Sequence, residues 1–269
     1  MARQEGIISL SGKVGDLIFS NRKGKRHAKA RSTKPMNQTA ATKRSSVDFG
    51  EASKIGARMR RAFAPLINEY GDTTVISRFT KHILKVFKTI PASSVGQKSL
   101  GQGNVGIFRD FQFNAFAKLD LLLLQPEVTL EGSGIKVVLK ENSIADLFKW
   151  VAAANAVVLQ LMVYNLNLNG EDDEVVCVKD LIILLEDEHF RGAKLQIPLN
   201  LKGEQVVCVA LGMHYLREDN LRIGDRTKRA AAIVYAVRLS EGLEVAFVPD
   251  QPVVKPVEKD EGGLEWELG

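Results

Sequence analysis

Short segments in which apolar and polar side chains alternate follow one another closely after residue 108, and this pattern limits the fold more than any other. The clearest run is Leu195, Ile197, Leu199 and Leu201, where every second residue is apolar. Further β-rich segments occupy residues 157–168, 175–185, 206–216 and 230–239. Seven or more such segments, with turn signals between them, predict an antiparallel β-sandwich over residues 108–248. We expect one short helix, near residues 144–151, as an insertion.

The first 44 residues have a different character. Two apolar runs, at residues 7–10 and 17–19, flank a glycine-containing turn and predict a small strand hairpin. Residues 21–44 contain nine Lys and Arg, no acid and almost no large apolar side chain. Such a composition cannot bury itself, so we expect an extended basic arm.

Helical periodicity fills residues 45–91. Ser45-Ser46 offers a helix cap, and a first apolar face consists of Phe49, Ala52, Gly56, Met59 and Phe63. A second, clearer stripe consists of Val75, Ile76, Phe79, Ile83, Val86, Phe87 and Ile90, and it ends at Pro91. These patterns predict a helical hairpin. Residues 92–107 are rich in Gly and Ser and are expected to be a flexible connection, so the fold class is α+β.

Charge is divided unequally along the chain. Residues 1–109 contain 21 Lys and Arg against 6 acids, whereas residues 110–269 contain 16 against 26. This asymmetry indicates either a polyanionic partner or association between unlike ends of neighbouring copies. The predicted contact residues, on the arm and on one strip of each helix, are Arg22, Lys23, Lys25, Arg26, Lys29, Arg31, Lys34, Lys54, Arg58, Arg61, Arg78, Lys81, Lys85 and Lys88.

Acidic side chains that such a basic surface would contact gather in two places. One is the predicted turn with Glu171, Asp172, Asp173 and Glu174. The other is the acidic tail over residues 249–269, which carries Glu265 and Glu267. Its end, Leu264-Glu265-Trp266-Glu267-Leu268, alternates apolar and acidic residues in a way that suits strand addition to a sheet edge. A half-buried tail is the alternative.

Several classes of site have little support in the sequence. Gly101-Gln102-Gly103-Asn104-Val105-Gly106 has the dinucleotide spacing, but no buried strand precedes it, and a hinge loop is favoured. The four histidines show no metal-ligand spacing, and Cys177 and Cys208 lie in apolar runs that favour inert thiols. We therefore nominate no catalytic, cofactor-binding or metal-binding residue and no small-molecule substrate.

The N-terminal segment resembles a known family. Gly12-Lys13-Val14-Gly15-Asp16-Leu17-Ile18-Phe19, the basic segment after it and Asp48-Phe49-Gly50-Glu51-Ala52-Ser53-Lys54 are similar to the start of an uncharacterised family of Bacteroidota proteins. The similarity extends through Ser77-Arg78-Phe79 and more faintly into the β-rich half. It implies one conserved architecture and transfers no active-site residue.

These observations favour a non-enzymatic structural subunit of a filament, sheath or virion-like particle. Its basic arm would contact an acidic region of a neighbouring copy, so we expect a homo-oligomer. The alternative is sequence-independent binding of nucleic acid by the same basic surface. No apolar run reaches the length of a membrane span and no secretory segment is seen, so we expect synthesis in the cytoplasm and no membrane insertion.

Overall fold

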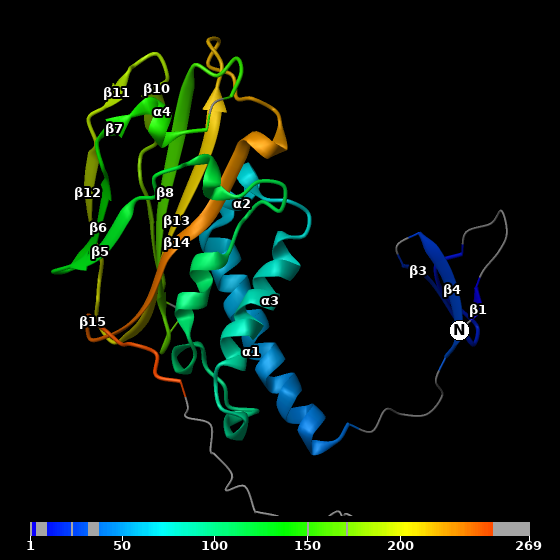
Figure 1. Ribbon diagram of the computed structural model, residues 1–269. Helices are drawn as coiled ribbons and strands as arrows, with labels where there is room; N and C mark the ends of the chain where they lie inside the picture. Colours follow the sequence, from blue (N-terminus) through cyan, green and yellow to red (C-terminus); the bar gives the residue numbers. More distant parts are fainter. Residues whose placement is uncertain are drawn as a thin grey trace, which may run out of the picture. The chain divides into compact units, whose positions relative to one another are not determined.

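The computed structural model describes residues 2–3, 10–22, 24–31, 38–149, 151–170 and 172–249. Within these ranges the chain divides into two compact units, Met1–Lys43 and Arg44–Gly269. It combines helices with many antiparallel strands, which confirms the α+β class (Figure 1). None of the described helices is long and apolar enough to cross a membrane.

The first unit is a four-stranded sheet. Strands β1 (Ala2–Arg3), β2 (Gly12–Val14), β3 (Leu17–Arg22) and β4 (Lys25–Ala30) lie in the order β1-β4-β3-β2, and all pairs are antiparallel. The prediction of an extended arm from residue 21 is wrong for residues 21–30. Gly24 adopts a φ of 76°, which glycine reaches without strain and which lets β4 turn back on β3. Predicted strand residues 7–9 and arm residues 32–37 lie outside the described residues.

Three helices pack on the second unit's large sheet. They are α1 (Ala40–Ala62), α2 (Ala64–Tyr70) and α3 (Val75–Lys88). Helix α1 begins five residues before the predicted Ser45, because the Thr39 hydroxyl caps it by accepting a hydrogen bond from the Thr42 N–H at 3.2 Å. Two residues of the predicted apolar faces, Phe49 and Ile76, are exposed.

The glycine-rich segment after α3 is folded rather than an open connection. It forms the 3₁₀ helices η1 (Ala92–Ser94), η2 (Leu100–Gln102) and η3 (Val105–Asp110), and Leu100, Val105 and Phe108 are buried. A Cβ on Gly103 would lie 2.7 Å from the Val86 carbonyl oxygen. This glycine therefore serves close packing on α3 and not chain flexibility.

The strands of the second unit form two main antiparallel sheets. The larger has the order β10-β8-β13-β14-β15, with β9 also on β8, and the smaller has the order β12-β6-β5. A further pair joins β7 to β11, and the short helices η4, α4 and η5 lie between strands. The bounds are η4 (Leu119–Leu121), β5 (Glu127–Glu131), β6 (Gly134–Leu139), β7 (Asn142–Ser143), α4 (Ile144–Leu147), β8 (Ala156–Asn167), β9 (Glu174–Cys177), β10 (Leu181–Leu184), β11 (His189–Phe190), β12 (Ala193–Pro198), β13 (Glu204–Leu216), η5 (Arg226–Lys228), β14 (Arg229–Ser240) and β15 (Leu243–Glu244).

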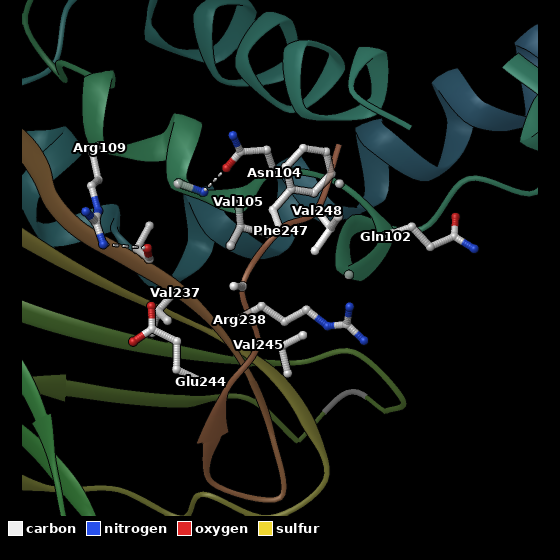
Figure 2. A pocket seen from close by; sticks show the side chains of 15 residues that line it. Gln102, Asn104, Val105, Arg109, Val237, Arg238, Glu244, Val245, Phe247 and Val248 are labelled. Atoms are coloured by element: carbon white, nitrogen blue, oxygen red, sulfur yellow. Dashed lines mark hydrogen bonds between the residues drawn. The ribbon is translucent and has the colours of Figure 1, made fainter. Parts of the chain in front are cut away.

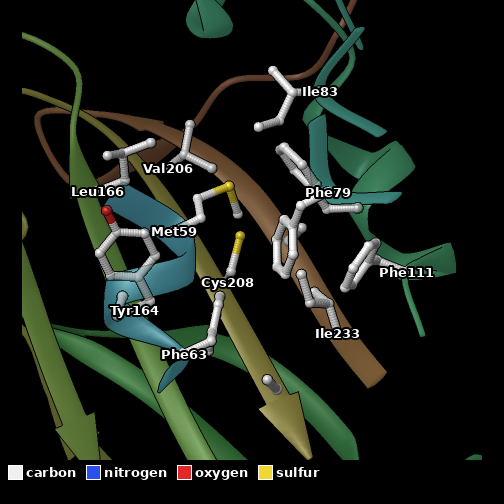
Figure 3. Packing of buried hydrophobic residues seen from close by; sticks show 14 of the residues in the cluster. Met59, Phe63, Phe79, Ile83, Phe111, Tyr164, Leu166, Val206, Cys208 and Ile233 are labelled. Atoms are coloured by element: carbon white, nitrogen blue, oxygen red, sulfur yellow. The ribbon is translucent and has the colours of Figure 1, made fainter. Parts of the chain in front are cut away.

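Strands β8, β13 and β14 at the centre of the large sheet are buried on both faces, and these faces belong to two apolar clusters. The helix-side cluster joins α1, α2 and α3 to residues such as Tyr164 and Cys208, and Figure 3 shows Met59 and Phe63 packed against them. The opposite cluster joins residues such as Val163 and Val209 to the inner side of the small sheet. Since side chains on a strand alternate between its faces, each long strand supplies both clusters.

Every buried residue that the structure describes lies between Asp48 and Leu239. The described core therefore lies entirely within residues 48–239 of the second unit.

Gly212 of β13 tests the packing between α2 and the large sheet. A Cβ at this position would overlap the buried ring of Tyr70, so we expect Gly212→Ala to lower the free energy of unfolding by about 1–3 kcal/mol. Gly224→Ala is the control, because nothing lies within 4 Å of its Cβ. Urea denaturation followed by circular dichroism measures both, and equal stability of the two variants would contradict this packing.

Candidate assembly surfaces

Arg58 of α1 is part of the fold and not of a solvated basic strip. Its guanidinium donates to Asp173, to the carbonyl oxygen of Asn167 at 2.7 Å and to that of Gly170 at 2.9 Å. The Tyr164 hydroxyl donates to the same Asp173 carboxylate at 2.7 Å. Burial alone would raise the pKa of Asp173, but the hydrogen bonds from Arg58 and Tyr164 lower it. The predicted basic contact Arg58 and the predicted acceptor Asp173 thus satisfy each other within one chain.

Arg78 of α3 is also held internally. It pairs with Asp72, whose side chain is almost fully buried, and donates to the carbonyl oxygen of Phe113 at 2.9 Å. Its guanidinium lies 5.6 Å from the centre of the Phe111 ring. The pKa of Asp72 is lowered, since hydrogen bonds from Thr74 and the charge of Arg78 outweigh the effect of burial. Arg78 therefore fixes the start of α3 to the segment that leads into the β-rich part.

The other predicted residues have different surroundings. Glu174 accepts a hydrogen bond from the Asn200 N–H at 3.0 Å, whereas Asp172 is exposed. Exposed basic side chains on the helices are Lys54, Arg61, Lys81, Lys85 and Lys88. On the N-terminal sheet, Lys25, Lys29 and Arg31 are exposed and Arg26 is half-buried. Lys23, Lys34, Glu171, Glu265 and Glu267 lie outside the described residues, as does the side chain of Arg22.

The N-terminal sheet has one apolar face and one cationic face. The strand register places Val14 opposite Leu17, and Phe19 opposite Ala28, on the first face. It places the second set, Lys13, Ile18, Lys25, His27 and Lys29, on the other face. None of the described side chains of this unit is buried, and Val14 is 56% exposed. The sheet therefore carries an apolar surface that the described residues of this unit do not cover.

An acidic cavity of about 400 Å³ lies in the second unit, beside α4. It lies between α4 and the segment that joins β10 to β11, and these three elements are labelled in Figure 1. Ile144, Phe148 and Leu185 supply apolar lining, and the consecutive acids Glu186–Glu188 form its rim. All three acids are exposed, and Lys149 in the same cavity is paired with Asp120 at 2.9 Å. This cavity therefore presents negative charge next to apolar surface.

Sequence reasoning passed over this second acidic run. The signal was present, since three consecutive acids follow an apolar strand. The sequence favours the four acids at residues 171–174 as the acidic acceptor because they form the longer run. The pairing of Asp173 with Arg58 could not be read from the sequence, because the two residues are 115 positions apart.

A second cavity, of about 320 Å³, is lined by the glycine-rich segment 101–106 and by β14 (Figure 2). Its two arginines are engaged nearby: Arg238 pairs with Glu204 at 2.9 Å, and Arg109 lies over the Tyr235 ring at 5.0 Å. The N–H groups of Asn104 and Gly106 already donate hydrogen bonds to side-chain oxygens of the protein. A dinucleotide needs free N–H groups at a strand-to-helix turn, and here α3 and a 3₁₀ helix precede the segment.

The two cysteines differ in their surroundings. Cys208 is fully buried in β13, and burial raises its pKa to about 12, as the apolar run predicts. Cys177 lies on the short strand β9 and is exposed, so the prediction of an apolar setting is wrong for this residue. Both thiols are free. Within the described ranges, no group of three or more His, Cys, Asp or Glu side chains is placed to hold a metal ion.

Arg58→Met tests the connection between α1 and the β8–β9 turn. The change leaves the Asp173 carboxylate without its cationic partner, so we expect a loss of about 1–3 kcal/mol in the free energy of unfolding. Arg61→Met removes an exposed arginine of the same helix and is expected to change stability by about 0.5 kcal/mol or less. Chemical denaturation measures the free energy of unfolding of both variants. A similarly small loss in the two would show that Arg58 does not stabilise the fold.

His214 of β13 makes stability depend on pH. Its ring nitrogen lies 2.9 Å from the Tyr70 hydroxyl, and burial is the main cause that lowers its pKa, with Arg229 adding to this and Asp180 opposing it. The unfolded chain binds the proton near its ordinary pKa of about 6.5, so this contribution to stability is complete above that pH and is lost as pH falls.

We expect His214→Gln to flatten the fall in unfolding free energy between about pH 7.5 and 5.5, where histidine titrates. His189→Gln, which changes an exposed histidine, is the control. A slope that is the same in the His214 variant and the native chain would exclude this role.

Comparison of the chain with models of protein families, with curated proteins and with solved structures finds no significant match. No residue role is therefore carried over from a relative. The similarity of the N-terminal segment to a Bacteroidota family stays a prediction. Any function for this chain follows from the chemistry of its own surfaces.

Proposed function

We propose that this protein is a non-enzymatic structural subunit that assembles with copies of itself. In this proposal the two main sheets of the second unit form an antiparallel sandwich, and the N-terminal sheet contacts the neighbouring copy. The observation that carries the proposal is the uncovered apolar face of that sheet. Exposed apolar side chains gain free energy when they are buried, so this face favours a partner surface.

The free energy gained by burying apolar side chains favours a partner surface that is itself partly apolar. Val14, Leu17 and Phe19 lie on the apolar face, and fully burying an exposed side chain of this kind stabilises by about 1.5–3 kcal/mol. The same unit has ten Lys and Arg against two acids. A complementary surface therefore combines apolar side chains with negative charge.

The acidic cavity beside α4 has this combination. Phe148 and Leu185 offer apolar contact, and Glu186–Glu188 offer carboxylates at the rim. Lys25 and Arg26, which lie side by side at the start of β4 and point to opposite faces, bring positive charge to whichever face meets the neighbour. The residues 171–174 are a weaker acceptor, because Arg58 neutralises Asp173 within the same chain.

Sequence-independent binding of nucleic acid is the second candidate. Lys81, Lys85 and Lys88 are exposed along α3 and suit contacts to phosphates. The strip is shorter than the sequence indicates, because Arg78 is engaged with Asp72. A phosphate backbone also leaves the apolar face of the N-terminal sheet uncovered. Assembly is therefore the better supported proposal.

Sedimentation velocity over a concentration series tests assembly without nucleic acid. We expect the full chain to form oligomers, and the chain lacking residues 1–43 to stay folded and monomeric, because the described core lies entirely within the second unit. Changing Glu186, Asp187 and Glu188 to Lys is expected to reduce assembly about tenfold or more, in line with like-charge repulsion at an interface. Adding Lys25→Glu and Arg26→Glu is expected to restore it.

The matched control is the change of Asp172, an exposed acid outside the cavity, to Lys. A full chain that remains monomeric at every concentration contradicts the proposal. A salt-sensitive shift of random DNA together with a monomeric protein would support the nucleic-acid alternative instead.

A further inference from the structure

An apolar groove of about 230 Å³ opens between the two main sheets of the second unit. Its floor comes from β6, β8 and β13, with Leu139, Leu161 and Leu211 among the lining residues. Its two sides are Leu181, which begins β10, and Leu195 of β12. Two exposed cations, Lys179 and Lys194, stand at these sides. The groove is therefore apolar at its base and mainly basic at its rim, where Asp180 is the one acid among its lining residues.

Strand β12 borders this groove with an unpaired edge. It is hydrogen-bonded to β6 along one side, and none of the described strands pairs with its other side. Pro198 has no N–H, so residues 193–197 are the part that can pair with an added strand. Along this part Leu195 and Ile197 face the core and Lys194 and Gln196 face outward.

The sequence of residues 264–268 matches these requirements. Leu264, Trp266 and Leu268 alternate with Glu265 and Glu267, so as a strand they would place apolar side chains on one face and carboxylates on the other. A single large aromatic side chain is the kind of group that fills an apolar groove of this size. The outward carboxylates would lie across from Lys194, and opposite charges on directly neighbouring strands stabilise their pairing.

We propose that residues 264–268 of a second copy add to the free edge of β12, with the indole of Trp266 in the groove. The choice of a second copy as donor rests on the proposed assembly. Backbone hydrogen bonds would supply affinity, and the groove would supply specificity for the aromatic side chain.

Binding of a fluorescein-labelled peptide of residues 258–269 to the chain 44–249 tests the contact. This chain holds the whole described core and lacks the N-terminal sheet, so the result does not depend on the other proposed interface. Fluorescence anisotropy should show saturable binding. We expect a peptide with Trp266→Ala to bind about tenfold more weakly or worse, as is usual for a central aromatic anchor.

A charge exchange tests the register at the rim. Lys194→Glu in the chain should weaken binding of the native peptide about threefold or more, and a peptide with Glu265→Lys and Glu267→Lys should bind this variant better than it binds the native chain. Lys202→Glu, an exposed lysine outside the groove, is the control and should leave binding unchanged. Binding that is unchanged by Trp266→Ala in the peptide and by Lys194→Glu in the chain would overturn the proposal.

Sedimentation of the full chain identifies the donor. If a second copy supplies the strand, Trp266→Ala should weaken association of the full chain several-fold. A monomeric chain in which the indole is nevertheless shielded from acrylamide quenching would show that the tail folds onto its own unit, and this outcome would overturn the second-copy donor.

Discussion

Burial of the large sheet on both faces is the constraint on which the second unit depends. Strands β8, β13 and β14 separate two apolar clusters, one beneath the helices and one beneath the small sheet. Such central strands cannot be solvated on either face, so both covering layers are required for the sheet to persist. Helices and small sheet are therefore coupled through the same three strands, although they do not share a cluster.

The polar side chains that hold the helices in place follow from this arrangement. Arg58, Arg78 and the Tyr70–His214 pair each connect a helical segment to the β-rich part at the margin of the helix-side cluster. Their charges and polar groups are satisfied within the same chain. Exposed cations remain on the N-terminal sheet, on the outer faces of α1 and α3 and on the β-rich part, where they include Lys179 and Lys194.

Periodicity carried most of the information that the sequence held about the fold. The stripe of α3 and the strands around Val163 and Val209 were predictable, because burial imposes a period that the residues must follow. The glycines of residues 101–106 led to the prediction of a flexible connection, since the sequence does not distinguish a glycine required by packing from one required by flexibility. Strand β4 was not predicted, because its Lys and Arg side chains are also typical of an extended basic arm. The only local sign of the hairpin is the single glycine in its turn. The sequence predicts Arg58 as a surface charge because its partner Asp173 lies 115 positions away, which leaves no local pattern. Asp72, the partner of Arg78, lies only six positions away, but its burial is not visible in the sequence.

One irregularity in the large sheet sets how its sequence can change. The pairing of β13 with β14 shifts between Val209 and Ala210, so that Ala232 and Tyr235, three positions apart, contribute to the same cluster. The two halves of β14 are therefore out of phase with each other. Loss or gain of a single residue here would exchange the clusters that receive every side chain beyond the shift. Val234, at the shift itself, is half-buried against the cluster on the side of the small sheet, so both the length of the strand and the apolar character of this residue are constrained.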